Sequence, residues 1–390
     1  MHTGKYVLAQ LTSFIERYEF NKCVDRYGGN YKVKDFSCWN QFICMMFGQL
    51  SHRESITDII NCLSSHQKAV YHLGIKQVVA VSTLTRANEN RDWRIYADFA
   101  NHLLGITRPL YLNDNEFCIE LDNTVYAFDS TTIDLCLSVF AWARFRKAKA
   151  AIKLHTLIDI RGNLPVFIHI TEGKVHDVNA LDELEFEENA FYVMDRGYID
   201  YKRLARINQA GSFFVVRAKD NLKFRCVESR KVDKATGLRC DQTIRLTGNK
   251  SAKDYPVYLR RTKYYDRVNK ATLVLLSNSF GIEAIQIAML YKQRWQVELF
   301  FKWVKQHLRI TTFWGHSENA VKTQIWIAVC TYLLVAYIKK QLDIKHSLYE
   351  IMQILSVSIF SKIPVNELFK NIKNEHEHDY VRNQLDIFDL

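Results

Sequence analysis

Residues 288–310 read AMLYKQRWQVELFFKWVKQHLRI. At about 3.6 residues per turn, a helix places five polar side chains of this stretch on one narrow arc. These side chains are Tyr291, Arg294, Glu298, Lys302 and Lys305. The neighbouring stripe is apolar and consists of Val297, Phe301, Val304 and Leu308. The pattern predicts one helix, anchored by its apolar stripe, that presents a single carboxylate among cations.

Two interpretations of this arc are open from the stretch alone. The arc can be an ordinary solvated helix surface, in which charge pairs one turn apart contribute about a few tenths of a kcal/mol each. Alternatively, Glu298 is a functional carboxylate and the cations around it bind an anion. The other carboxylates of the chain decide between the two.

Composition and charge place the chain among folded, basic proteins. With 390 residues it is long enough for two or three domains, and 48% hydrophobic residues exclude a disordered chain. The formal net charge of +11 suits a polyanionic partner, although many basic proteins bind none.

Cysteine usage and apolar runs give no sign of secretion or membrane insertion. The nine cysteines are scattered without a C-x-x-C pair, which argues against a disulfide framework or a zinc knuckle and favours reduced thiols in the cytosol. The first residues are too polar for a signal peptide. The apolar run 325–338 is too short to span a bilayer, and we expect a helix buried inside the fold.

The first part of the chain, to about residue 110, has a helical pattern. Ser51 with Glu54 predicts a capping box at the start of one helix, and Ser82 or Thr85 can cap a later one. Several short helices, the last entered through an arginine-containing segment, fit a helix-turn-helix-like DNA reader. A plain helical accessory domain fits equally well.

After residue 116 the pattern changes to strands that alternate later with helices. Antiparallel strands followed by strand and helix alternation predict an α/β fold with a mixed sheet and flanking helices. The polar stretch from about 221 to 270 predicts a β-strand insertion. The other predicted strands are 116–129, 131–143, 151–160, 166–173, 190–195, 211–219 and 272–280, and the predicted helices are 179–188, 199–209 and the long helix that carries Glu298.

Asp129 and Asp195 each end an apolar predicted strand, where an α/β sheet places its ligand groups. Glu298 would add a third carboxylate from a helix packed across the same sheet. Three carboxylates without a His or Cys cluster are the ligands that magnesium or manganese prefers, and they disfavour zinc. Two such ions can activate an attacking oxygen and stabilise the leaving one in phosphodiester displacement. The cations around Glu298 would then bind phosphates.

The spacing Y-x2-R-x3-E-x6-K within residues 291–305 resembles the YREK signature of DDE transposases from bacterial insertion sequences. The sequence DST at 129–131 and the sequence DRGY at 195–198 resemble the segments that hold the first and second aspartates of that family. The order of these blocks, with the β insertion before the glutamate, is also similar. The resemblance covers about residues 80 to 345.

This resemblance implies a ribonuclease-H-like catalytic domain at 111–345, interrupted by the β insertion at about 221–270. An all-helical DNA-binding domain at 1–110 would precede it, and a helical segment at 346–390 would follow. The implied activity is cut-and-paste transposition, in which water attack nicks the element ends and the freed 3′ hydroxyl joins target DNA. The implied partners are double-stranded terminal inverted repeats, target DNA and a second copy of the chain in a homodimer, with no membrane. The implied location is the bacterial cytoplasm, at the nucleoid.

The resemblance also implies a role for each site residue. Asp129 would bridge two Mg²⁺ ions, with Mn²⁺ as an alternative, and Asp195 and Glu298 would each complete one metal site. Phosphate contacts near the cleaved end fall to Tyr291, Arg294, Lys302 and Lys305. Trp295 either stacks on a distorted base or packs in the core.

Two further segments have open interpretations. The predicted loop at 141–155 mixes aromatic and basic residues, which suits either a nucleic-acid groove or a solvated charge cluster. Its basic residues assigned to DNA are Arg144, Arg146, Lys147 and Lys149. His176 and Asp177 join the metal site, orient a nearby group, or form a capping turn with Asp177 as the cap.

Two other classes of protein remain open beside a transposase. One is a transposase-derived DNA-binding protein that has lost its chemistry. The other is a metal-dependent nuclease or phosphatase of a different purpose, whose small substrate would need neither the basic loop nor the helical front domain.

Overall fold

The computed structural model describes residues 4–112, 121–146, 149–307 and 313–370. The chain forms two compact units, one of residues 1–107 with 307–390 and one of residues 108–306. The sequence-based domain limits were residues 110 and 345, whereas the two units divide at residues 107 and 306. The predicted C-terminal segment 346–390 lies within the described residues only as far as 370.

The first unit is helical and is built around one long apolar helix, α12. Its helices are α1 (Val7–Thr12), α2 (Arg17–Arg26), α3 (Cys38–Leu50), α4 (Ile56–Ser65), α5 (Gln67–Tyr71), α6 (Val81–Asn90), α7 (Arg94–Thr107), α12 (Glu318–Gln341), α13 (Leu348–Ser358) and α14 (Val365–Leu368). Helices α3, α6, α7 and α13 pack against α12. Among the described residues only α12 has the length and hydropathy of a membrane span, and 89% of its apolar window is buried in the protein. The sequence-based prediction of a buried helix at 325–338 is confirmed.

Helix caps in this unit differ from the predicted ones. Ser55, whose hydroxyl accepts a hydrogen bond from the Asp58 backbone N–H at 3.1 Å, caps α4. The predicted cap Ser51 is instead the residue that ends α3, because α3 continues to Leu50. Ser82 and Thr85 lie inside α6 rather than at a helix start. The three cap predictions were therefore wrong.

The second unit contains a mixed sheet with ten strands in its described residues. The strands are β1 (Val125–Leu135), β2 (Arg144–Arg146), β3 (Lys149–Asp159), β4 (Leu164–Glu172), β5 (Phe191–Met194), β6 (Phe213–Arg217), β7 (Phe224–Arg230), β8 (Leu238–Leu246), β9 (Leu259–Asp266) and β10 (Ala271–Ser277). The α-helices are α8 (Tyr201–Gln209), α9 (Asn249–Asp254), α10 (Ala284–Gln293) and α11 (Trp295–His307). Short 3-10 helices are η1 (Arg108–Tyr111), η2 (Ala141–Ala143), η3 (Asp177–Glu183), η4 (Arg196–Tyr198) and η5 (Lys234–Thr236).

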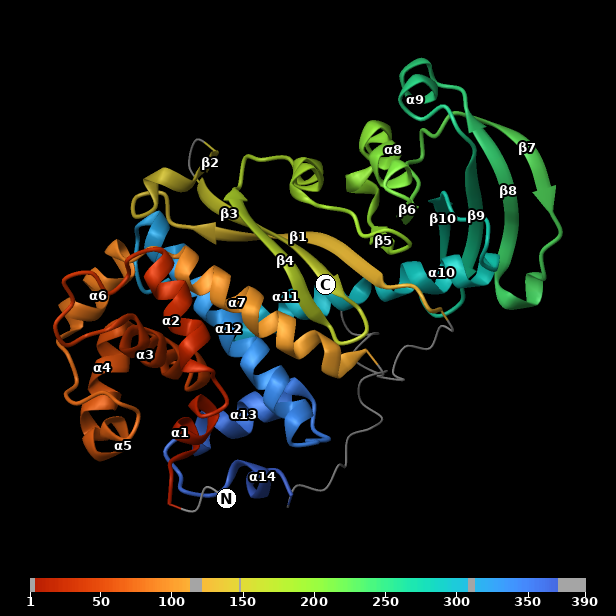
Figure 1. Ribbon diagram of the computed structural model, residues 1–390. Helices are drawn as coiled ribbons and strands as arrows, with labels where there is room; N and C mark the ends of the chain where they lie inside the picture. The colour runs from red at the N-terminus through yellow and green to blue at the C-terminus, as the bar shows by residue number, and fades with distance from the viewer. Residues whose placement is uncertain (1–3, 113–120, 147–148, 308–312, 371–390) are drawn as a thin grey trace. The chain divides into compact units, whose positions relative to one another are not determined.

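The sheet order is β2-β3-β1-β5-β6-β10-β9-β8-β7, with β4 also paired to β3. Strands β1, β5 and β6 are parallel to one another, and all other pairs are antiparallel. The predicted β insertion supplies β7, β8 and β9, which extend the same sheet through β10 (Figure 1). The expected mixed sheet is confirmed.

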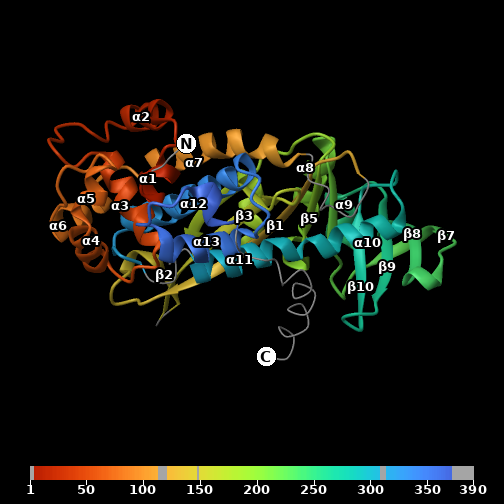
Figure 2. The same ribbon diagram turned by 90° about the horizontal axis from the view of Figure 1, so that it is seen from below.

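Helices cover both faces of this sheet. Apolar side chains of α8 and η3 pack with Phe128, Tyr192 and Phe214 into one core. Helix α10 packs against β5, β6, β9 and β10, and it leads into α11 along the other face (Figure 2). Alternation of side chains along each strand separates the two faces.

Three predicted elements have different bounds or types. The predicted strands 116–129 and 131–143 overlap one strand, β1, because pairing with β3 continues from Tyr126 through Leu135 without a break. Residues 116–120 lie outside the described residues, and residues 141–143 form η2. The predicted helix 179–188 is the shorter η3. The predicted long helix is divided at Arg294 into α10 and α11.

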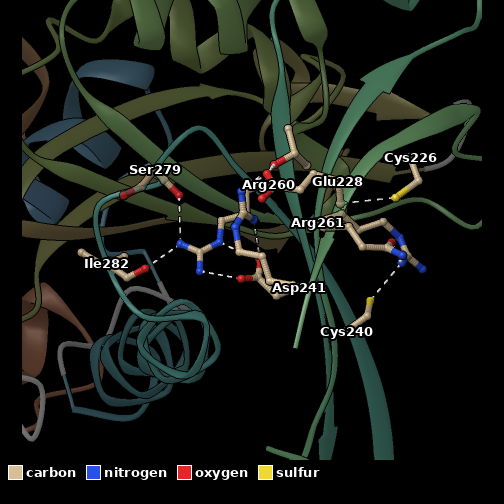
Figure 3. A network of polar contacts seen from close by, with 11 residues as sticks. Cys226, Glu228, Cys240, Asp241, Arg260, Arg261, Ser279 and Ile282 are labelled. Carbon is tan, nitrogen blue, oxygen red and sulfur yellow. Dashed lines mark hydrogen bonds and ion pairs between the residues drawn. The ribbon is translucent and has the colours of Figure 1, made fainter. Parts of the chain in front are cut away.

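A buried ion pair fastens the inserted strands to the start of α10 (Figure 3). Arg260 in β9 is 5% exposed and donates two hydrogen bonds to the Asp241 carboxylate in β8, at 2.8 and 2.9 Å. The same guanidinium donates to the carbonyls of Ser279 and Ile282. Glu283, the residue after Ile282, caps α10. The insertion is thus linked to the helix that carries Tyr291.

Candidate active site

The two aspartates lie side by side at the carboxyl end of a parallel strand pair. Strands β1 and β5 pair in register up to Phe128 and Met194, so the next residues are Asp129 and Asp195. Asp195 follows the end of β5 as predicted. Asp129 lies within β1, contrary to the prediction, because β1 continues alongside β3 after β5 has ended. The parallel pairing of β1 with β5 ends just before Asp129 and Asp195. Both carboxylates therefore lie at the carboxyl end of this strand pair.

Arg294 connects two of the three carboxylates. Its backbone N–H donates to the Tyr291 carbonyl at 3.1 Å, so the chain tightens where α10 gives way to α11. This turn directs the guanidinium to the sheet, where Nη1 donates to Asp129 Oδ2 at 2.8 Å. Nη2 donates to the Glu298 carboxylate one turn further along the chain. Asp129 and Glu298 are therefore brought together through a shared cation.

Tyr291 holds the third carboxylate. Its hydroxyl donates to Asp195 Oδ1 at 3.0 Å. Burial, as the largest cause, raises the pKa of Tyr291 to about 12, so the hydroxyl keeps its proton at neutral pH. Each carboxylate of the predicted set is thus hydrogen-bonded to a side chain of the predicted signature. Although the predicted helix is divided into α10 and α11, Tyr291, Arg294 and Lys305 all face the sheet, as the predicted arc requires.

The charge of this site is not balanced. Burial raises the pKa of Asp129 to about 6; Arg294 acts in the opposite direction, and Glu298 and Asp195 add to the rise. Burial also opposes the charge on Arg294, but Glu298 and Asp129 outweigh it and raise the pKa of the guanidinium. Three carboxyl groups lie around one guanidinium, and this excess of acidic groups favours a further cation.

The donor chemistry fits a hard divalent cation, but the side chains are not arranged as its ligands. Carboxylate oxygens suit magnesium or manganese better than zinc. Within the described part of the chain, no three His, Cys, Asp or Glu side chains are grouped closely enough to hold a metal ion. The contacts above explain this, since Arg294 stands between Asp129 and Glu298 and Tyr291 covers Asp195.

A second polar network lies on the opposite face of β1. Ser130, next to Asp129, donates its hydroxyl hydrogen to Asp177 Oδ1 at 2.8 Å. Lys153 in β3 forms an ion pair with the same oxygen at 3.0 Å and donates to the Val175 carbonyl. The Ser130 backbone N–H donates to Asp129 Oδ1 at 2.8 Å, which joins this network to the candidate active site.

Of the three sequence-based interpretations of Asp177, its location argues against two and leaves the third, that it orients a nearby group. Asp177 contacts the side chain of Ser130, whereas the Asp129 carboxylate points to Arg294 on the other face, so Asp177 is not among the clustered carboxylates. It is also not a helix cap, because His176 occupies the cap position of η3 without a side-chain hydrogen bond. Sequence reasoning selected Asp177 but missed its partners Ser130 and Lys153, which lie on the same sheet face as Phe128 and Leu157.

The other residues of α11 that were assigned to DNA are Lys305, Lys302 and Trp295. Lys305 donates to the Thr132 carbonyl at 3.1 Å, and burial lowers its pKa. Lys302 is exposed, and Trp295 is partly buried, which leaves stacking and packing both open for this tryptophan. Arg217, at the carboxyl end of β6, adds a positive charge near Tyr291 that sequence reasoning missed.

The predicted basic loop is an antiparallel hairpin of β2 and β3 rather than a loop. Arg144 is exposed at its start. Arg146 and Lys149 belong to the two strands, but their side chains are not described, and Lys147 lies outside the described residues. Their DNA contacts stay predictions.

Two family models match parts of the chain. Residues 120–334, more than half of the chain, match the family described as the transposase DDE domain. Residues 3–76 match a domain of unknown function, DUF4372.

Individual relatives are bacterial. The protein y4zB of Sinorhizobium fredii, named as a transposase, is 36% identical over 211 residues, which are 53% of this chain and 58% of the relative. A protein of Geobacillus stearothermophilus named as the transposase of insertion sequence element IS5377 is 32% identical over 225 residues, 56% of this chain and 59% of the relative. The chain thus spans somewhat under two thirds of these two relatives.

One solved structure is also similar over most of the chain. It is the cryo-EM structure of the piggyBac transposase synaptic complex with hairpin DNA, with a TM-score of 0.42 and 12% sequence identity. The similarity covers 96% of this chain and 82% of that one.

Proposed function

Because the chain belongs to the transposase DDE-domain family, we propose that it is the transposase of a bacterial insertion sequence. The proposed reaction is cleavage of DNA at the terminal inverted repeats, followed by transfer of the 3′ hydroxyl end into target DNA. The observation that supports it best is that Asp129 and Asp195 end the same parallel strand pair and that Arg294 links Asp129 to Glu298. These residues are our candidates for the three acidic groups of the family.

We assign the fold of the catalytic part to the ribonuclease-H-like type. The order β4-β3-β1-β5-β6, with β1, β5 and β6 parallel and β3 and β4 antiparallel, supports this assignment. Strands β7 to β9 enter between β6 and β10 and would be the insertion that precedes the glutamate helix. The YREK spacing, with Tyr291 and Arg294 directly on the carboxylates, supports membership of the YREK group and the cut-and-paste pathway.

Asp129, Asp195 and Glu298 would hold Mg²⁺ or Mn²⁺, two ions per site. Bound there, these ions would supply an activated attacking oxygen and compensate the charge on the leaving oxygen. The protein residues fix the geometry around the reaction. The Ser130 backbone N–H orients Asp129, and Arg294 and Tyr291 sit where they can pass from a carboxylate to a DNA phosphate.

The proposed DNA surface extends beyond these residues. Lys302, Lys305, Trp295 and the hairpin that begins at Arg144 would contact the DNA end, and the helical unit would recognise the terminal repeat. The high net charge supports a polyanionic partner. Pairing of two ends requires two active sites, so we propose a homodimer in the complex with DNA.

Cleavage of linear DNA that carries the flanking inverted repeats tests the proposal. The assay contains Mg²⁺ and compares the unaltered protein with Glu298→Gln and, as a matched control, Glu318→Gln. Glu318 is an exposed glutamate of α12 that forms an ion pair with Lys322. End-specific cuts by the unaltered protein and by Glu318→Gln, but not by Glu298→Gln, would support the proposal. End-specific binding without any cutting would instead indicate a DNA-binding protein that has lost its chemistry.

A further inference from the structure

Arg294 occupies the position between Asp129 and Glu298 that a shared cation would take. Its two Nη atoms each donate to a different carboxylate, and its side chain is only 16% exposed. A guanidinium in this position compensates two carboxylates that would otherwise repel each other in a partly buried place. A divalent cation bound by the same two carboxylates would compete with it for the same oxygens.

The environment of Arg294 also shows that its present contacts are incomplete. Its Nε atom is buried and lacks an acceptor in the described part of the chain. Arg294 therefore has a donor left over, and buried donors without acceptors are unfavourable. A phosphate group with several acceptor oxygens is a better match for the planar donor set of a guanidinium.

We propose that Arg294 is an exchangeable counter-ion that couples loading of the metal to binding of DNA. Without DNA it neutralises Asp129 and Glu298 and holds off a divalent cation. When the DNA backbone reaches the site, the guanidinium exchanges its contacts with the two carboxylates for contacts with a phosphate. The two carboxylates then become free to bind the metal. Tyr291, which bonds Asp195, would move in the same way. This inference rests on the proposed function.

The exchange makes two binding steps favour each other. If DNA removes the competitor of the metal, DNA must tighten metal binding, and the metal must tighten DNA binding by the same factor. The benefit is that the free protein does not carry a loaded nuclease site. Nothing comparable is expected of Lys302, which lies in the following helix, α11, and is exposed.

The test measures Mn²⁺ binding by isothermal titration calorimetry to the full chain without DNA. The proteins are the unaltered chain, Arg294→Gln, Arg294→Lys and the control Lys302→Gln, which also removes one positive charge from α11. The binding event that disappears in Glu298→Gln is taken as the active-site event. We expect Arg294→Gln to bind Mn²⁺ about tenfold more tightly or better, Arg294→Lys to lie between, and Lys302→Gln to change less than threefold. Equal or weaker Mn²⁺ binding by Arg294→Gln would overturn the inference.

A second arm needs no variant and so does not depend on the folding of Arg294→Gln. Mn²⁺ is titrated into the unaltered chain with and without a duplex of the terminal repeat. We expect the duplex to tighten Mn²⁺ binding about tenfold, and unchanged affinity in the bound complex would contradict the exchange. A duplex that does not bind at all would count against the proposed function, whereas end-specific binding and cleavage without coupling would count against the exchange alone.

Discussion

Replacement of Arg260 by alanine should destabilise the sheet unit strongly. The change leaves Asp241, which is 4% exposed, without its two-point partner. Removal of one partner of a buried pair typically costs about 3–5 kcal/mol. Arg230 lies 3.5 Å from Asp241 and would still compensate part of its charge, so we expect the lower end, about 3 kcal/mol.

This loss can be measured as a change in thermal unfolding. For a unit of this size a loss of 1 kcal/mol lowers the midpoint by about 2–4 °C, so Arg260→Ala should lower it by roughly 6–12 °C. The double variant Arg260→Met with Asp241→Leu removes both charges and should recover most of the loss, because it leaves no buried ion unpaired. Arg239→Ala is a suitable control, since Arg239 is an exposed arginine of β8.

Two results would refute this reasoning. A loss below about 1 kcal/mol for Arg260→Ala would mean that water or Arg230 already compensates Asp241. A double variant no more stable than Arg260→Ala would mean that the carbonyl contacts to Ser279 and Ile282, rather than the charge pair, hold the start of α10.

Three further changes test other parts of the structure. Burial raises the pKa of Asp129 to about 6, so this carboxyl adds to stability below about pH 4 and loses that contribution, about 2–3 kcal/mol, as pH rises to 6. Other carboxyls, such as Asp182 and Asp266, have lowered pKa values and act in the opposite direction, so the stability of the unaltered chain relative to Asp129→Asn, measured by urea titration in chelator, should fall by this amount over the window. Asp177→Asn removes the charge partner of Lys153 and should lower the rate of end cleavage about 10-fold or more while end binding stays within about twofold, and unchanged cleavage would contradict a positioning role. Ser55→Ala should cost about 1 kcal/mol of helix stability through loss of the α4 cap, whereas Ser82→Ala inside α6 should stay within about 0.5 kcal/mol in the same denaturation assay.

Local patterns were sufficient for the elements that carry the candidate site. The strand that ends at Met194 is a short continuous apolar run, and the helical arc from Tyr291 to Lys305 has an apolar stripe beside it; both patterns are visible in the sequence. The mixed sheet with a strand-rich insertion followed from the same patterns.

Features set by pairing partners could not be predicted in the same way. The polar sequence around Asp129 looks like the end of a strand, yet β1 continues because β3 supplies partners for Asp129 to Leu135 that are 27 to 15 positions later in the chain. The same holds for Ser130, whose partner Asp177 is remote in sequence. The cap predictions were wrong for a related reason. Ser51 and Ser55 are equally good N-cap residues by local propensity, but Ser51 already ends α3, so α4 begins after Ser55.

The contacts of Arg294 show why a motif alone does not state what its residues do in the free protein. The sequence pattern suggests a phosphate ligand, but without DNA the nearest anions are the carboxylates that the same motif supplies. A cation placed one helical turn from an essential acid neutralises that acid until a stronger anion arrives. The spacing of Arg294 and Glu298 therefore serves the free protein as well as the proposed complex, and the Mn²⁺ titration separates the two roles.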